Sequence, residues 1–295
     1  MNATLTRWID KSVLYSLNRR VPATLAAHAE APTLEGVLAQ TRVDEKTAVY
    51  PLTAPGEHAV WLDTPHGPLR CRARVRPHAN PAAPLLLYHH GLNEYPYTAS
   101  WRRIVADRQR IPMHHVCVQA PYHDSWLAPL AQGFASLGSV YQMIAGSLRV
   151  MALVQDAFEA QGAAHTVLVG VSWGGMTSML YQGLYGRARA VIPMLTSPDI
   201  AQVIWDTARL FDRPVDVPLE TIKQHLDFSH YYRACDPARL FPLLGDQDLF
   251  FRLENHADVY AAHEPAVVHR GHITGLWQPA PLRKHVLTVL HHIME

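Results

Sequence analysis

The residues with the clearest chemical meaning are Gly170-Val171-Ser172-Trp173-Gly174. They follow the short apolar run Thr166–Val169 and precede a helical pattern over Gly174–Tyr185, so the serine stands in a strand-to-helix turn. Glycines two residues before and after Ser172 leave room for a tight turn, which would expose the hydroxyl at a helix N-terminus, where negative charge is favoured. An ordinary glycine-rich turn has a similar composition, but the position between strand and helix favours a nucleophile.

A serine hydroxyl is a weak nucleophile and needs a base, which in turn needs an orienting carboxylate. The base candidate is His272, in the loop just beyond the strand candidate Ala266–His269 and before the closing helical pattern. His269 competes with it, but His269 lies in or at the end of that strand and is expected to point into packing. The sequence therefore favours His272 as the general base.

Three aspartates are candidates for the acid that orients this base. Asp248 follows the strand candidate Leu240–Leu244 in the run Gly245-Asp246-Gln247-Asp248, where a carboxylate in a loop after a late strand is expected. Asp246 stands beside a glycine, a pattern that favours a turn. Asp199 follows the preceding strand candidate. Asp248 is preferred, and Asp246 and Asp199 remain alternatives.

Acyl transfer also requires N–H donors for the oxyanion that forms in the transition state. One candidate is the backbone N–H of Trp173, directly after Ser172. The other is the N–H of Leu92, in the loop His90-Gly91-Leu92-Asn93 that follows the strand candidate Leu85–His89. Gly91 would let the chain turn sharply there. We therefore expect an oxyanion hole built from Leu92 and Trp173.

The elements that must position these groups alternate between short apolar strands and longer helices. This alternation predicts an α/β fold with a doubly wound, mostly parallel central sheet. An opening hairpin at Val60–Thr64 and Leu69–Val75 is expected to extend the edge of this sheet with antiparallel strands. The remaining expected strands are Leu85–His89, His115–Gln119, Thr166–Val169, Ala190–Leu195, Leu240–Leu244 and Ala266–His269, and the expected helices are Ser100–Gln109, Gly138–Gln161, Gly174–Tyr185 and Pro281–Ile293. Residues 196–239 read as a small helical lid insertion over the crevice.

Composition excludes several other classes. The chain has 295 residues, 48% of them apolar, a formal net charge of +1 and three cysteines without CxxC spacing. We therefore expect no nucleic-acid partner, no disulfide framework and no metal or other cofactor. The sequence also lacks a recognisable signal peptide and an uninterrupted apolar run long enough for a membrane span, so we expect a cytoplasmic protein.

Two regions follow from this pattern. Residues 1–57 form an N-terminal helix and extension, and residues 58–295 form the catalytic domain with the insertion 196–239. Met1–Arg20 carries apolar residues at helical spacing and is a candidate surface for a homodimer.

Together, His90-Gly91, the turn Gly170–Gly174, Gly245-x-x-Asp248 and Gly271-His272 resemble, in order and separation, the α/β-hydrolase superfamily. The resemblance covers residues 58–295, and two loops distantly resemble a poorly characterised branch of predicted hydrolases. It implies the α/β-hydrolase fold and a cofactor-free serine esterase. Two departures are the bulky Trp173 after the nucleophile and the second aspartate in the acid loop.

The crevice beside Ser172 is expected to be aromatic and nearly uncharged, which suits a small-molecule ester with an apolar or aromatic group. The predicted substrate-binding residues are His90, Gly91, Asn93, Tyr95, Tyr122 and Trp205. The same triad could serve an amidase, a thioesterase or an acyltransferase, and a non-catalytic ligand-binding protein of this fold is the alternative from another class.

Overall fold

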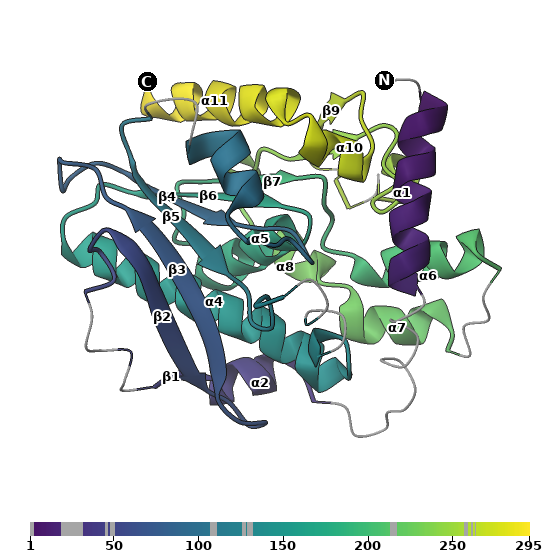
Figure 1. Ribbon diagram of the computed structural model, residues 1–295, viewed down its shortest axis with the longest axis horizontal. Helices are drawn as coiled ribbons and strands as arrows, with labels where there is room; N and C mark the ends of the chain where they lie inside the picture. Colours follow the sequence, from purple (N-terminus) through teal and green to yellow (C-terminus); the bar gives the residue numbers. More distant parts are fainter. Residues whose placement is uncertain are drawn as a thin grey trace.

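A single mixed sheet crosses the molecule, with helices on both of its faces (Figure 1). The computed structural model describes residues 3–18, 32–44, 47, 51–106, 111–125, 128, 132–212, 217–256, 259–260, 262 and 264–295. Within these residues the strands lie in the order β1-β2-β3-β5-β4-β6-β7-β8-β9. Their bounds are β1 Arg42–Val43, β2 Gly56–Asp63, β3 Leu69–Arg76, β4 Leu85–His89, β5 His114–Gln119, β6 Thr166–Val171, β7 Ala190–Met194, β8 Leu243–Gly245 and β9 Ala266–Val268.

The central strands pair in parallel, as their continuous apolar sequences predict. Strands β4, β5, β6 and β7 are buried at every residue, and Leu87 at the centre of β4 faces Val116 of β5 and Leu168 of β6. The hairpin β2–β3 joins the edge of β5 antiparallel. The predicted fold class, a doubly wound and mostly parallel sheet with an antiparallel extension, is confirmed.

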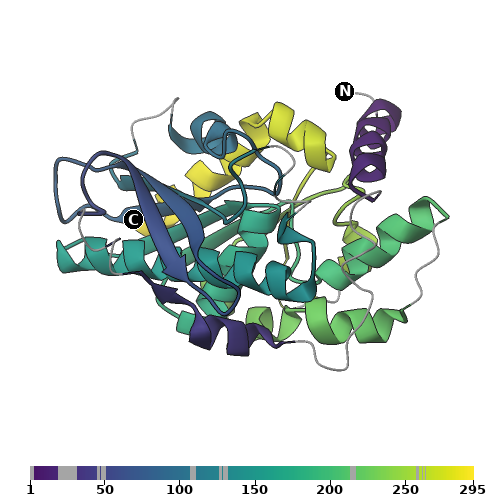
Figure 2. The same cartoon turned by 60° about the horizontal axis from the view of Figure 1, so that its bottom comes forward.

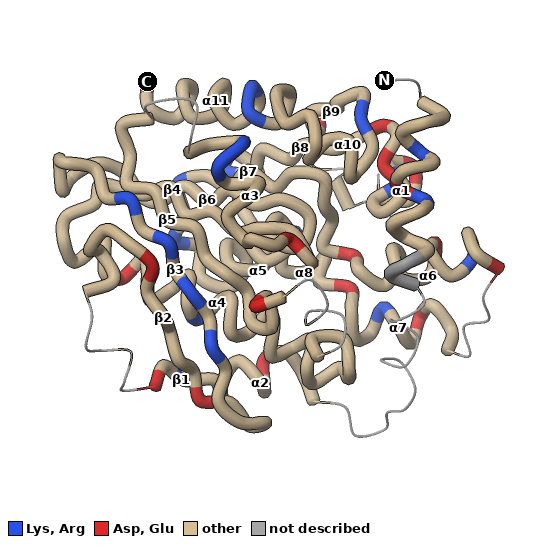
Figure 3. The backbone as a smooth tube through the Cα atoms, viewed as in Figure 1, with Lys and Arg blue, Asp and Glu red and all other residues tan. Residues whose placement is uncertain are grey.

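Strand β3 shows how an alternating pattern separates core from solvent. Its apolar residues are buried, while arginines occupy the alternate positions and form a line of positive charge along the strand (Figure 3). Arg72 forms ion pairs with Glu57 at 3.1 Å and Asp124 at 2.8 Å. This run is therefore a solvated face whose charges are partly paired within the chain.

Helices cover the sheet in two layers (Figure 2). The helices α4 (Leu137–Ala160), α5 (Trp173–Tyr185), α2 (Leu34–Gln40) and α8 (Ser229–Arg233) enclose the larger apolar core, and α11 (Ala280–Met294) with the π-helical turn η3 (Arg102–Ala106) encloses the second core. Among the described helices, α4 alone has the length and apolarity to cross a membrane, yet 78% of its apolar window is buried inside the fold. Such burial is what a core helix shows.

Several elements differ from their predicted form. The expected helix Ser100–Gln109 is a short turn α3 (Ala99–Trp101) followed by η3, and residues 107–109 lie outside the described residues. Strand β8 begins three residues late, because Leu240 forms only an isolated bridge to Val191. The insertion 196–239 contains helices α6 (Ile200–Leu210), α7 (Leu219–Leu226) and α8.

The segment before residue 57 is joined closely to the rest of the protein. The unpredicted helix α2 packs on α4, where the guanidinium of Arg149 donates to the carbonyls of Leu38 at 2.7 Å and Thr41 at 3.0 Å. Strand β1 then adds to the outer edge of β2. This helix buries Leu34, Val37 and Leu38 in the larger core, and the partly buried Arg149 satisfies carbonyls at its C-terminal end.

The N-terminal helix α1 (Ala3–Asn18) lies against α10 (His272–Trp277) and α6 (Figure 1). Its inward positions Thr6, Asp10 and Leu14, spaced by four, are buried, whereas Leu5 and Trp8 are exposed. The helix therefore uses one face within its own chain. A homodimer through this helix remains a prediction.

The fully buried centre of β4 should dominate stability. We expect Leu87→Ala to lower the free energy of unfolding by about 2–5 kcal/mol, because it removes apolar contacts and leaves a cavity between two paired strands. Val267→Ala, at a half-exposed position of β9, should cost less than about 0.5 kcal/mol. Urea unfolding should show a lower midpoint at an unchanged slope for Leu87→Ala alone.

Candidate active site

Ser172 sits in a strained turn between β6 and α5. Its φ of 53° and ψ of −121° lie outside the regions that side-chain-bearing residues favour, and its N–H donates to the carbonyl of Met194 at 2.9 Å. A Cβ at Gly170 would lie 2.3 Å from the carbonyl oxygen of Gly174, and one at Gly174 would lie 2.1 Å from that of His89. Only glycine fits at either position, so both flanking glycines are required by the turn.

Three side chains from separate loops form a continuous hydrogen-bonded chain with Ser172 at its end. The Oγ of Ser172 lies 3.0 Å from Nε2 of His272, and Nδ1 of His272 lies 2.8 Å from Oδ2 of Asp248. With Nδ1–H donating to the carboxylate, Nε2 is free to accept the serine proton. His272 begins α10 after β9, and Asp248 follows β8, so both lie in loops at the carboxyl ends of parallel strands.

Of the three aspartates considered as the acid, Asp248 is the one that contacts His272. Its other oxygen, Oδ1, accepts from the N–H groups of Phe250 at 2.7 Å and Phe251 at 3.0 Å. Asp246 contacts the exposed His269 at 2.6 Å. Asp199 instead caps α6 by accepting from the N–H of Gln202 at 2.9 Å.

The imidazole of His272 is buried and enclosed by aromatic rings. Phe250 stacks on it with ring centroids 4.3 Å apart, and Phe251 lies 5.7 Å away. Burial by itself lowers the pKa of His272, but the charge and hydrogen bond of Asp248, with a further contribution from Asp10, raise the pKa above its ordinary value of 6.5. The site thus favours the imidazolium, the form that a general base acquires.

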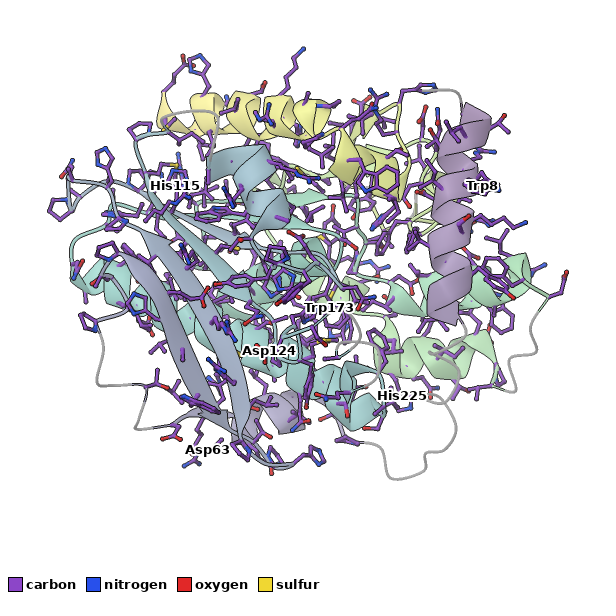
Figure 4. The ribbon with its side chains drawn as sticks, in the orientation of Figure 1. Trp8, Asp63, His115, Asp124, Trp173 and His225 are labelled. Carbon is purple, nitrogen blue, oxygen red and sulfur yellow. The ribbon has the colours of Figure 1, made fainter. Side chains whose placement is uncertain are left out.

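The loop after β4 carries Leu92, one of the two predicted oxyanion donors, and lies close to Ser172. A Cβ at Gly91 would lie 3.5 Å from the Cβ of Ser172, so this loop adjoins the nucleophile directly. In the described part of the chain, the N–H groups of Leu92 and Trp173 meet no protein acceptor. Trp173 lies near the middle of the molecule in Figure 4, and its ring packs edge-on against Phe134.

Two side chains of the same loop, the buried His90 and the partly buried Glu94, hold Gly91 in place. His90 accepts at Nε2 from the N–H of Ala120 at 3.0 Å, so its Nδ1–H donates to the carbonyl of Gly91 at 2.7 Å. The carboxylate of Glu94 accepts from the N–H of Gly91 at 3.2 Å and from the hydroxyl of Ser100 at 2.7 Å. The loop that carries the predicted donor Leu92 is therefore held at both peptide groups that flank the Cα of Gly91.

Glu94 was not among the residues predicted from the sequence, although it is the one carboxylate between His90 and Trp101. Its contact with the N–H of Gly91 depends on a turn of the loop that brings residues three positions apart together, and this turn was not predicted. Asp10 was missed as well, and nothing in the sequence near it points to a site 262 residues away.

A cavity of about 610 Å³ opens beside Ser172. Among the predicted substrate-binding residues, Gly91, Asn93 and Tyr95 line it, as does Leu92, the predicted oxyanion donor. Apolar residues of α1, α6, α10 and the acid loop also line it: Val13, Leu14, Ile200, Val203, Ile204, Phe250, Phe251, Ile273, Leu276 and Trp277.

The other three predicted substrate-binding residues do not line this cavity. His90 turns away to bind Ala120, and the hydroxyl of Tyr122 donates to Gln142 at 2.9 Å. Val203 and Ile204 lie on the face of α6 that meets the cavity, whereas Trp205, one residue further along the helix, points away from that face and packs against the larger core. The predicted lining residue was therefore wrong by one position along the helix.

No group of His, Cys, Asp and Glu in the described ranges has an arrangement that could hold a metal ion. Cys71, Cys117 and Cys235 are free and buried, and burial raises the pKa of each thiol.

Comparison with solved structures shows the α/β-hydrolase fold. The chain is similar to the esterase Pf2001 of Pyrococcus furiosus, with 11% identity and a TM-score of 0.57 over 80% of this chain and 90% of that one. It is also similar to a carboxylesterase structure from the thaumarchaeon Nitrososphaera gargenis, with 11% identity and a TM-score of 0.51 over 79% of this chain and 98% of that one. The chain is also similar to DcsB, whose structure was solved with a substrate analogue, with 12% identity and a TM-score of 0.52 over 80% of this chain and 99% of that one. No protein-family model and no curated protein sequence matches the chain.

The carboxyl of Glu94 gives a test of how the oxyanion loop is held. Burial raises its pKa to about 7, against the opposing effects of its hydrogen bonds to Ser100 and Gly91 and of the nearby Arg103. Because the folded pKa lies above the unfolded one, Glu94 contributes stability that is complete below pH 4.5 and lost as the pH rises through about 7.

We therefore expect the stability of the wild type relative to Glu94→Gln to fall between about pH 4.5 and 7 and to level off above that range. Urea unfolding of both proteins across this range measures the difference. A stability difference that does not change with pH would contradict the burial of this carboxyl.

Proposed function

We propose that this protein is a serine hydrolase that cleaves carboxylic esters through an acyl-enzyme intermediate. The single observation that carries the proposal is the chain of two hydrogen bonds from Asp248 through His272 to Ser172, at 2.8 and 3.0 Å. Such a chain supplies a nucleophile, a base and an orienting group in contact.

In the first half-reaction, Ser172 Oγ attacks the ester carbonyl carbon while Nε2 of His272 takes the hydroxyl proton. Asp248 holds the imidazole so that Nε2 faces the serine, and it stabilises the imidazolium that forms. The N–H groups of Leu92 and Trp173 accommodate the negative charge on the carbonyl oxygen. His272 then returns its proton to the alkoxide as the C–O bond to the alcohol breaks.

In the second half-reaction, water attacks the acyl-serine. His272 takes a proton from this water and returns it to Ser172 Oγ as the acyl–oxygen bond breaks. The products are one carboxylic acid and the regenerated enzyme, so no oxidant, metal or cofactor enters the balance.

The cavity walls indicate the kind of ester. Apolar side chains dominate the lining. Its charged side chains include Glu94, which is engaged by Gly91 and Ser100, and Arg103, whose charge acts on Glu94. An apolar or aromatic group therefore fits this cavity better than a phosphorylated or strongly anionic one. The fold shared with Pf2001 and with the Nitrososphaera carboxylesterase supports ester hydrolysis as the reaction.

A fluorophosphonate probe tests the nucleophile. We expect the wild type to be labelled covalently and Ser172→Ala to remain unlabelled, because the probe reacts only with an activated serine. Ser197→Ala serves as the control, since this serine is buried outside the cavity. Hydrolysis of p-nitrophenyl esters of increasing chain length should be lost in Ser172→Ala only. An unlabelled wild type without esterase activity would refute the proposal.

Exchange of the acid tests the assignment of Asp248. Asp248→Asn should lower kcat by on the order of 10³–10⁴, because an amide cannot hold the imidazole in the required tautomer. Asp246→Asn removes a carboxylate two residues away, whose contact is His269, and should leave kcat within about twofold. Near-normal turnover in Asp248→Asn would make the assignment wrong.

A further inference from the structure

A second buried carboxylate reaches the catalytic loops from the N-terminal helix. Asp10 of α1 is fully buried, and its Oδ2 accepts from the backbone N–H of His272 at 2.8 Å and of Leu249 at 3.3 Å. Its Oδ1 accepts from the N–H of Ile273 at 3.0 Å. Three N–H groups from two loops thus converge on one side chain.

These N–H groups belong to the residues that carry or adjoin the triad. His272 and Ile273 open α10, and Leu249 directly follows Asp248. Gly271, which precedes α10, has no side chain to accept from the first N–H groups of that helix, and Asp10 accepts two of them. Asp10 therefore holds the acid loop and the base loop in one fixed relation.

Asp10 and Thr6 pack so closely against Gly271 that no side chain fits at residue 271. A Cβ at Gly271 would lie 2.7 Å from Oδ2 of Asp10 and 2.7 Å from Cγ2 of Thr6. The φ of Gly271 is −87°, which any residue adopts, so the glycine is needed for the close approach of α1 rather than for its backbone conformation. Figure 1 shows α1 lying beside α10.

Electrostatics couple Asp10 to the triad. Burial and the charge of Asp248 raise the pKa of Asp10, whereas His272 and the two α10 N–H groups lower it, and the net shift is upward. Asp10 in turn raises the pKa of His272. Other charged groups nearby face elsewhere: Arg7 and Lys11 of α1 are exposed, Arg270 donates to the carbonyl of His269, and Asp206 of α6 binds Gln202 and Asn255.

We propose that Asp10 is a positioning residue of the active site, which ties the acid loop to the base loop and supports the imidazolium of His272 during turnover. The proposal rests on the proposed hydrolase function. A carboxylate is the required group, because all three of its partners are donors and an amide would turn its own N–H groups toward one of them. Asp10 does not touch the serine or the imidazole ring, so it acts through His272 and Asp248.

Kinetics with two variants and a matched control test this role. Asp10→Asn should lower kcat for a p-nitrophenyl ester by on the order of 10–100-fold with little change in KM, because the triad loses its alignment while most of the cavity wall remains. Gly271→Ala should give a loss in the same direction, since its methyl group displaces Asp10 without removing a polar atom. Lys11→Gln alters one charge at an exposed position of the same helix and should leave kcat unchanged.

The pH profile separates positioning from general destabilisation. In the wild type, kcat/KM should fall as the pH drops through the raised pKa of His272, because the base must be neutral to accept a proton. Removing the charge of Asp10 lowers that pKa, so the acid limb of Asp10→Asn should move to lower pH. The limb should stay in place in Lys11→Gln.

A measurement independent of hydrolysis uses the backbone amides. In the Ser172→Ala protein, Asp10→Asn should speed hydrogen exchange at Leu249, His272 and Ile273 by at least about tenfold, since these N–H groups lose a charged acceptor. The amides of Phe250 and Phe251, which donate to Asp248, should change much less. An NMR titration of the His272 imidazole in the same background gives its pKa directly.

The outcomes distinguish the two proposals. A labelled, active wild type combined with an Asp10→Asn variant of normal kcat and unshifted acid limb would overturn the role of Asp10 and leave the hydrolase intact. An unlabelled, inactive wild type would overturn the hydrolase, and the exchange and titration data would then decide on Asp10. If the five amides exchange equally faster in Asp10→Asn, the residue is merely structural and the proposal fails.

Discussion

The contact between the end of β4 and the turn after β6 constrains everything around the nucleophile. Gly174 lies so close to the carbonyl of His89 that no side chain fits between them, and Gly170 meets Gly174 in the same way. This close packing forces Ser172 into its unusual backbone conformation. It also brings the loop of Gly91 against the serine, so the nucleophile and the proposed oxyanion donors are positioned by one steric condition.

Three buried or partly buried carboxylates then fix the loops around that turn. Asp248 accepts from two N–H groups beyond itself as well as from His272, Glu94 accepts from Gly91, and Asp10 accepts from both catalytic loops. A carboxylate removed from water is costly unless donors surround it, so each can stay buried only while its loop keeps its shape. In this protein the carboxylates around the site are therefore held mostly by hydrogen bonds from backbone N–H groups.

The apolar elements have a complementary role. Helices α1, α6 and α10 contribute to the cavity wall, and two of them come from segments outside the alternating strand–helix pattern, the N-terminal helix and the insertion. The aromatic pair Phe250 and Phe251 belongs to the acid loop itself and covers His272. The same two side chains thus line the cavity and enclose the imidazole of His272.

The sequence alone determined the fold class and the turn that holds Ser172, and it predicted that Asp248 and His272 would follow in that order. These features are local: apolar runs predict buried parallel strands, and the glycines around Ser172 are adjacent to it in the chain. The choice among Asp248, Asp246 and Asp199 was open from the sequence, because each follows a strand and only the closed sheet brings one of them within 2.8 Å of His272. Trp205 and Tyr122 were placed in the cavity by proximity in sequence, whereas helix rotation and a hydrogen bond turn them away from it. Tertiary structure also decided the contacts of Asp10, since a polar residue on an amphipathic helix gives no local sign that its carboxylate will meet backbone N–H groups 262 residues further on.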